Sequence, residues 1–125
     1  MIRPCLAMFE ELQEADRNMV RVVLAAGEEM IDGRAELRDE ISRPFALAEA
    51  TLAAAAGYAG IGGGFRLIES RVIDLVTGDV AVVTCSTDAT PAELLAGVAP
   101  IRADGWEKAV CRASLDAVNR FIVKD

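Results

Sequence analysis

The chain contains the same pattern twice, and this internal repeat restricts its fold more than any other feature of the sequence. The pattern Gly-x-Ala-x-x-Arg begins at Gly33 and again at Gly97, and in both places an acidic residue follows two positions after the arginine. A short polar break and an alanine-rich amphipathic segment come next in both copies. Self-similarity at a fixed period marks a duplicated structural unit, so it outweighs the weaker local signals.

The spacing between the copies defines how the two halves correspond. The two glycines, and likewise Arg38 and Arg102, are separated by 64 residues, whereas the following apolar helical positions match at 63. Further upstream, residues 20–23 align with residues 80–83 at a separation of 60. This difference predicts a hairpin loop about four residues longer in the second copy, because insertions collect in turns.

The first copy predicts three strands and a helix. Residues 19–25 and 30–38 have the β-branched content of strands, joined by a glycine-containing turn. Ser42 is a typical helix cap and Pro44 fits the first turn, so a helix is expected over residues 43–56. Residues 1–17 are compatible with a short amphipathic helix or with a strand, and we favour the strand because the repeat aligns them with residues 65–76.

The second copy predicts the same order. Strands are expected over residues 65–76, 80–85 and 93–101, with a bulge near residues 69–72 where the apolar phase shifts. Pro100 places the end of the third of these strands at a sheet edge or beyond the strand pairing. Asp104 and Glu107 resemble a capping box, so the closing helix is expected over residues 107–122.

The predicted fold class is therefore α+β, a tandem βββα repeat that forms a pseudo-twofold two-layer domain with two helices packed on β-sheet. With 125 residues, the chain is expected to be a single domain, residues 1–125. Repeat 1 covers about residues 1–59 and repeat 2 about residues 64–125. A glycine-rich linker, residues 60–64, joins them.

Composition limits the partners. The formal charge of −7 disfavours nucleic acid and an anionic membrane surface as partners. Hydrophobic residues make up 53% of the chain, which is more than one small monomer usually buries. The helix at residues 43–56 is apolar nearly all round and needs cover on several sides. We therefore expect a homodimer, with Ala46, Ala50, Ala53 and Ala54 approached by a partner.

The cysteines and the apolar segments bear on localisation. The three cysteines form an odd set without paired spacing, no signal peptide is recognisable, and no apolar segment is long enough to span a bilayer. These features favour a cytoplasmic protein with reduced thiols. Cys85 and Cys111 lie in apolar segments and are expected to be buried rather than reactive.

Most catalytic and metal-binding chemistry has no support in this sequence. The chain has no histidine, so neither a Ser-His-Asp nor a Cys-His arrangement can form within it. The acidic clusters lack the spacing of a calcium loop, and the glycines at 60–64 follow a helix, the reverse of the order in a phosphate-binding loop. No catalytic residue, metal ligand or cofactor is predicted.

The best candidate for ligand binding is the pair of repeated arginines. Arg38 and Arg102 each precede a helix start, and a pseudo-twofold would bring their loops into similar surroundings facing one cleft. A guanidinium binds a carboxylate through two parallel hydrogen bonds, and the helix amides near Asp104 and Gly105, or those near Ser42, can complete an anion site. The alternative is that each arginine forms a surface ion pair with its neighbour, Glu40 or Asp104.

The duplicated layout resembles a known family. The strand at residues 96–99 runs into Trp106, Ala109 and a helix of small residues, and this arrangement is similar to the allosteric regulatory domain at the C-terminus of 2-isopropylmalate and citramalate synthases. The resemblance implies a non-catalytic module that dimerises and binds a small amino or keto acid between its halves. The family commonly opens this helix with a Gly-Pro turn, where this chain has Asp104-Gly105, so no binding residue is transferred by identity.

Three functions remain open from the sequence. The leading one is a small-ligand-binding or dimerising regulatory module for a small carboxylate or amino-acid metabolite. The second is a small enzyme that handles an acid or thioester with a carboxylate or an arginine in a shared cleft. The third is a structural adaptor, which differs from the first only in lacking a pocket.

Overall fold

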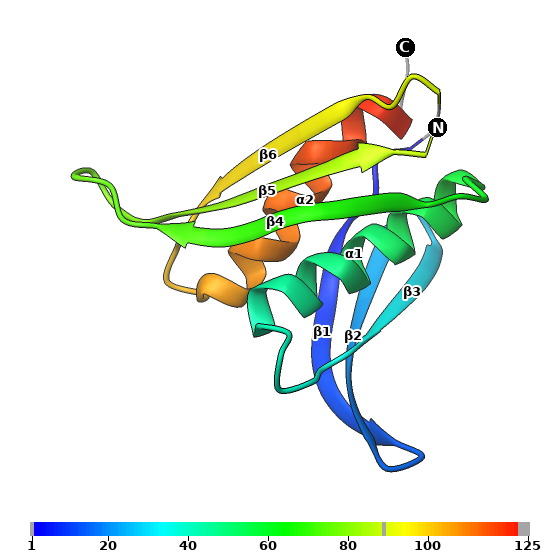
Figure 1. Ribbon diagram of the computed structural model, residues 1–125, viewed down its shortest axis with the longest axis horizontal. Helices are drawn as coiled ribbons and strands as arrows, with labels where there is room; N and C mark the ends of the chain where they lie inside the picture. Colours follow the sequence, from blue (N-terminus) through cyan, green and yellow to red (C-terminus); the bar gives the residue numbers. More distant parts are fainter. Residues whose placement is uncertain (1, 89, 123–125) are drawn as a thin grey trace.

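A computed structural model describes residues 2–88 and 90–122 (Figure 1). Two three-stranded antiparallel sheets lie on either side of a pair of helices (Figure 1). The element order is βββα twice, so the predicted α+β fold with a tandem βββα repeat is confirmed. The extreme positions of the two predicted repeats, residues 1 and 123–125, lie outside the described residues.

The first unit consists of β1 (Cys5–Glu14), β2 (Arg17–Ala26), β3 (Glu29–Glu36) and α1 (Arg43–Ala59). Its strands pair in the order β1-β2-β3. The N-terminal segment is therefore a strand, as we favoured. Its acidic residues suit a helix locally, but pairing with β2 satisfies its backbone groups, and tertiary context overrides propensity.

The second unit consists of β4 (Phe65–Ile73), β5 (Val80–Thr87), β6 (Leu94–Pro100) and α2 (Trp106–Ile122). Its strands pair in the order β4-β5-β6. Pro100 ends the edge strand β6, opposite Val80, where a missing amide is tolerated. The prediction for this proline is confirmed.

The two units share an irregularity at matched positions. β1 has a register shift between Leu6 and Met8, and β4 has one between Leu67 and Glu69. The unpaired residue in β4 is Ile68, one position before the predicted bulge region. A bulge conserved between the two units bends both sheets in the same way.

The predicted alignment of the central strands is wrong by one residue. Val22 pairs with Gly33 in the first unit and Val83 pairs with Gly97 in the second, so the central strands correspond at a separation of 61 and the third strands at 64. The later hairpin loop is therefore three residues longer, not four. A separation of 60 would turn every side chain of one strand to the opposite face of its sheet.

The helices fill the space between the sheets. α1 packs on β2 and β3 and also touches β4, while α2 packs on β5 and β6 and also touches β1, and the two helices contact each other. A continuous apolar core results, whose largest members come from both units. They include Val22, Leu24, Leu47, Leu52, Val83, Val110 and Val118.

One of the two reasons that we gave for a dimer, an uncovered face on the first helix, is wrong. Ala46, Ala50 and Ala54 are fully buried within the monomer, because the two sheets and α2 cover α1 on several sides. Ala53 alone of the four alanines is exposed. The helix also continues past its predicted end at residue 56, through Gly57, and ends before Gly60, which has the left-handed conformation of a helix C-cap.

Over the described residues, no helix has the length and apolarity that crossing a membrane requires.

Candidate functional site

The first turns of the two helices lie together. The guanidinium carbon of Arg43, at the start of α1, lies 5.8 Å from the ring centre of Trp106, at the start of α2. The two residues are 63 positions apart and so occupy matched places in the repeat. The pseudo-twofold therefore brings two equivalent helix starts to one place, and a cation over an aromatic face is an attractive contact.

Specific hydrogen bonds position this junction. The hydroxyl of Ser42 accepts a hydrogen bond from the amide of Phe45 at 3.3 Å, which caps α1 as predicted. The hydroxyl of Ser70 on β4 donates to the carbonyl of Pro44 at 2.8 Å. The start of α1 is thereby attached to the second sheet.

Arg43 is held by two carboxylates from different units. Its Nη2 lies 2.6 Å from Oε1 of Glu11 on β1 and 4.0 Å from Oε2 of Glu107 on α2. About half of the side chain remains accessible to solvent. The guanidinium is therefore oriented by the protein while part of its surface can still meet a ligand.

An open hollow of about 780 Å³ lies at this junction. Its volume is about twice that of the hollow between β6 and α2, which is about 390 Å³. A pocket of this size with mostly apolar walls and few polar groups is typical of small-molecule sites. Its lining residues are Arg43, Pro44, Val72, Asp79, Ile101, Gly105 and Trp106.

The hollow carries one charge of each sign on an apolar surface. Pro44, Val72, Ile101 and Trp106 supply the walls, Arg43 is the cation, and Asp79 is the carboxylic acid. A hydrogen bond with the neighbouring carboxyl of Asp74 raises the pKa of Asp79, and the charge repulsion between the two groups adds to this effect. A cationic ligand group placed beside Asp79 would favour the ionised form of that residue.

The four residues predicted from the sequence have different surroundings. Gly105 lines the hollow, with a backbone φ of 103°. Its amide donates to the carbonyl of Arg102 at 3.0 Å, so Arg102 belongs to the turn at the edge of the hollow. Arg38 lies after β3, with its Nε 3.8 Å from Oε1 of Glu40. The expected ion pair between Arg38 and Glu40 is confirmed.

Asp104 has a partner that the sequence did not indicate. Arg112 on α2 binds its carboxylate through two hydrogen bonds, Nη1–Oδ1 at 3.2 Å and Nη2–Oδ2 at 2.6 Å. This guanidinium holds the pKa of Asp104 below its ordinary value. The alternative that paired Asp104 with Arg102 is therefore wrong. Gly105, rather than Asp104, directly precedes α2, so the predicted cap position is also displaced by one residue.

Neither repeated arginine lines the hollow at the helix junction, as far as the described residues show. Sequence reasoning instead missed Arg43, Asp79 and Trp106. One signal was present, because Arg43 and Trp106 are matched positions of the repeat and Trp106 is the single tryptophan of the chain. Asp79 lies in a turn between strands, and no local pattern marks it.

The prediction that Cys85 and Cys111 are buried is confirmed. Cys85 and Cys111 are inaccessible to solvent, and burial raises the pKa of both thiols to about 11. At neutral pH such thiols are protonated and weakly nucleophilic. Neither lines the hollow.

No protein-family model matches this sequence, and neither does any curated protein.

Proposed function

We propose that this protein is a homodimeric regulatory module that binds a small amino-acid or carboxylate metabolite in the hollow between the two helix starts. The observation that supports it best is the combination of Arg43, Asp79 and an apolar wall in one place. The resemblance to the regulatory domains of 2-isopropylmalate and citramalate synthases points to the same ligand class. The proposal assigns no catalytic role to the chain.

The hollow has the chemistry that an α-amino acid with an apolar side chain needs. The guanidinium of Arg43 pairs with the ligand carboxylate, and the free amides at the start of α2 add to that site. The carboxylate of Asp79 accepts hydrogen bonds from the ammonium group of the ligand. The side chain of the ligand packs on Trp106, Ile101 and Val72, where removing apolar surface from water stabilises the complex.

The residues predicted from the sequence are proposed to support this site rather than to form its walls. Arg102 and Gly105 form the turn before α2 and contribute to carboxylate binding there. Asp104 keeps that turn in position through Arg112. Arg38 is the residue that matches Arg102 in the first unit, before α1, and it is proposed to contribute to carboxylate binding in the same way.

A titration monitored by tryptophan fluorescence tests the proposal, because Trp106 is the only tryptophan. Amino acids, 2-keto acids and acyl-CoA compounds are added separately, with thermal unfolding as a second measurement. We expect a saturable change for one of the acid classes. At 100 times its dissociation constant, a ligand that binds only the native state raises stability by about 2.7 kcal/mol.

Variants separate the roles within the site. Arg43→Met should weaken the binding of every carboxylate ligand at least about tenfold. Arg17→Met, which removes an arginine from the first sheet, away from the hollow, should leave binding unchanged. Asp79→Asn should weaken amino acids but not keto acids. Arg38→Ala and Arg102→Ala show whether the repeated arginines contribute. The proposal is rejected if no acid gives a saturable signal, or if Arg43→Met and Asp79→Asn both keep full affinity.

A further inference from the structure

The outer face of the first sheet is covered by ion pairs. Oδ2 of Asp32 accepts from Nε of Arg21 at 3.2 Å and from Nε of Arg34 at 3.3 Å. Arg21 also donates to Glu10 at 3.3 Å, and Arg34 donates to Glu14 at 2.5 Å. These five side chains come from all three strands and form a connected polar layer. A sheet face of this kind is stable in contact with water.

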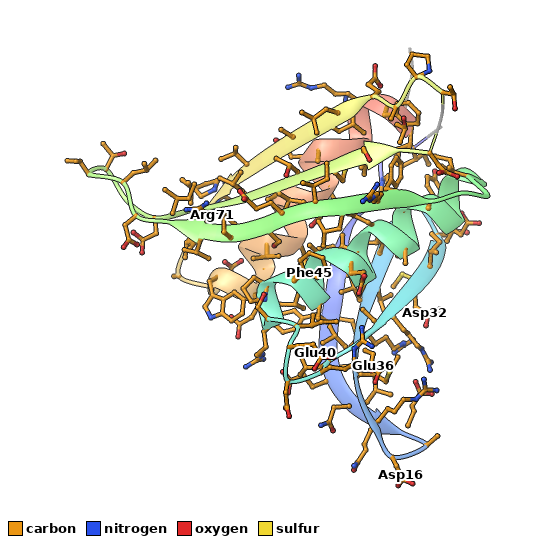
Figure 2. The ribbon with its side chains drawn as sticks, in the orientation of Figure 1. Asp16, Asp32, Glu36, Glu40, Phe45 and Arg71 are labelled. Atoms are coloured by element: carbon orange, nitrogen blue, oxygen red, sulfur yellow. The ribbon has the colours of Figure 1, made fainter. Side chains whose placement is uncertain are left out.

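On β5 and β6, the outer face of the second sheet is apolar at the positions that match Arg21, Asp32 and Arg34. In the second sheet Val82 pairs with Val98, and these two residues match the pair Arg21 and Arg34 in the first sheet. Ala96 lies at the position that matches Asp32. Val98 is 51% exposed and Leu94, nearby on β6, is 69% exposed. Figure 2 shows Arg71 on β4 and Asp32 on β3, on the two sheets that flank the helices.

The duplication provides an internal comparison. Both units have the same topology and the same bulge, and the first folds with a charged outer face. The apolar character of the second is therefore not a requirement of the fold, and an exposed apolar patch of this kind marks an interaction site. We call it the β4–β6 outer face, with its apolar members Ile68, Ile73, Val80, Val82, Leu94, Ala96, Val98 and Pro100.

We propose that the β4–β6 outer face is the surface on which a second copy of this chain docks, face to face. This inference rests on the homodimer in the proposed function and names its interface. The central strand β5 presents Val80 and Val82 on this face, followed by Thr84 and Ser86. The margin on β4 carries both charge signs, Glu69 and Arg71, whose side chains lie 3.7 Å apart and are at least half exposed.

The charges on β4 complement themselves in a twofold dimer. A twofold interface places the same patch of both subunits in contact, so the patch must be self-complementary. If the twofold axis lies in the interface and runs perpendicular to the strands, the two β4 strands stack in opposite directions. Arg71 of each copy then reaches Glu69 of the other. Two chains of net charge −7 then meet where the local charge is balanced.

The free edge of β6 is a less suitable route to the same dimer. The carboxylate of Asp116 on α2 accepts the outward amide of Val98 at 3.0 Å, and Pro100 has no amide to donate. Side chains and prolines that block an edge in this way disfavour strand addition. Stacking of the sheet faces, which needs no backbone hydrogen bonds, is therefore the favoured mode.

The size of the face fits a reversible dimer. Three strands about 4.8 Å apart, with eight residues rising about 3.3 Å each, span on the order of 400 Å² of flat sheet, and side-chain relief increases the accessible area. Two such faces bury on the order of 1,000 Å², at the low end for specific interfaces. We expect a dissociation constant in the micromolar range.

Sedimentation velocity from about 1 to 100 μM on the full chain tests the interface. One variant transfers the charges of the first sheet to the second, Val82→Arg with Ala96→Asp and Val98→Arg, at positions where the first unit tolerates these residues. A matched pair of single substitutions follows, Leu94→Arg and Met30→Arg, at equivalent places with exposures of 69% and 65%. We expect at least tenfold weaker dimerisation for the triple variant and for Leu94→Arg, and no change for Met30→Arg.

The outcomes separate this inference from the proposal beneath it. A wild-type chain that stays monomeric at 100 μM overturns the homodimer and its interface together. A wild-type dimer that the triple variant and Leu94→Arg leave intact overturns the β4–β6 outer face alone. If the triple variant fails to fold, as judged by circular dichroism, Leu94→Arg against Met30→Arg decides. Equal weakening by those two also overturns the inference. Ligand titration at Trp106 is independent of all these results.

Discussion

Gly97 on β6 lies directly against the backbone of Ala113 on α2, so closely that a Cβ atom at Gly97 would overlap the carbonyl oxygen of Ala113. Gly33 has the same relation to Ala50 on α1. The repeated glycines are therefore the points at which each helix approaches its own sheet. Glycine in a strand interior is unfavourable unless such a close approach requires it.

Gly97→Ala is expected to lower the free energy of unfolding by at least about 1 kcal/mol, because the new methyl group forces α2 away from β6. Chemical denaturation measures the change. Gly62→Ala is the matched control, since a Cβ atom there meets nothing within 4 Å, and it should leave stability unchanged or slightly raised. Equal stability of wild type and Gly97→Ala would remove the close-approach explanation.

The ion pair between Asp104 and Arg112 should make stability depend on pH in the acid range. Arg112 lowers the pKa of Asp104 in the folded protein, so the contribution is complete above the unfolded pKa and is lost as the pH falls through the folded pKa. Asp104→Asn should therefore lower the melting temperature at pH 7, and this difference from wild type should shrink below about pH 4. A difference that stays constant from pH 7 to pH 2 contradicts this assignment.

Thiol reactivity should distinguish Cys5 from the other two cysteines. Cys5 is exposed, whereas Cys85 and Cys111 are buried with pKa values raised to about 11. In the native protein at pH 8, a chromogenic disulfide reagent should therefore label one thiol quickly, and all three after unfolding. Cys5→Ser should abolish the fast phase. Rapid labelling of the Cys5→Ser protein would show that the core opens readily.

The cap of α1 depends on Ser42. Ser42→Ala removes the acceptor for the amide of Phe45 and should lower the free energy of unfolding by about 1 kcal/mol. Ser42→Asp supplies another acceptor and should restore most of the loss. Thermal unfolding of the three proteins makes the comparison, and a Ser42→Ala protein as stable as wild type would show that packing alone holds the helix start.

The repeated βββα order could be predicted from the amino-acid sequence, because each unit carries its own periodicity, turns and helix cap. The matched Gly33 and Gly97 and the cap at Ser42 were predictable, since each depends on neighbours within the same unit. The burial of Cys85 and Cys111 was predictable from the apolar segments in which they lie. Even the strand at residues 5–14 followed from the repeat rather than from its own composition.

The register of the strands and the residues that line the hollow became known from the packing of the two units. A one-residue shift between the central strands leaves the match between their apolar residues almost unchanged, but it exchanges the two faces of a sheet. The hollow joins residues from α1, β4, α2 and the connections around them, so Arg43, Asp79 and Trp106 meet only after both units have packed. The contrast between the two outer faces emerged in the same way, because the residues to compare are known only when strand pairing is known. Local patterns record what lies next to a residue along the chain, whereas a site between units depends on how those units dock.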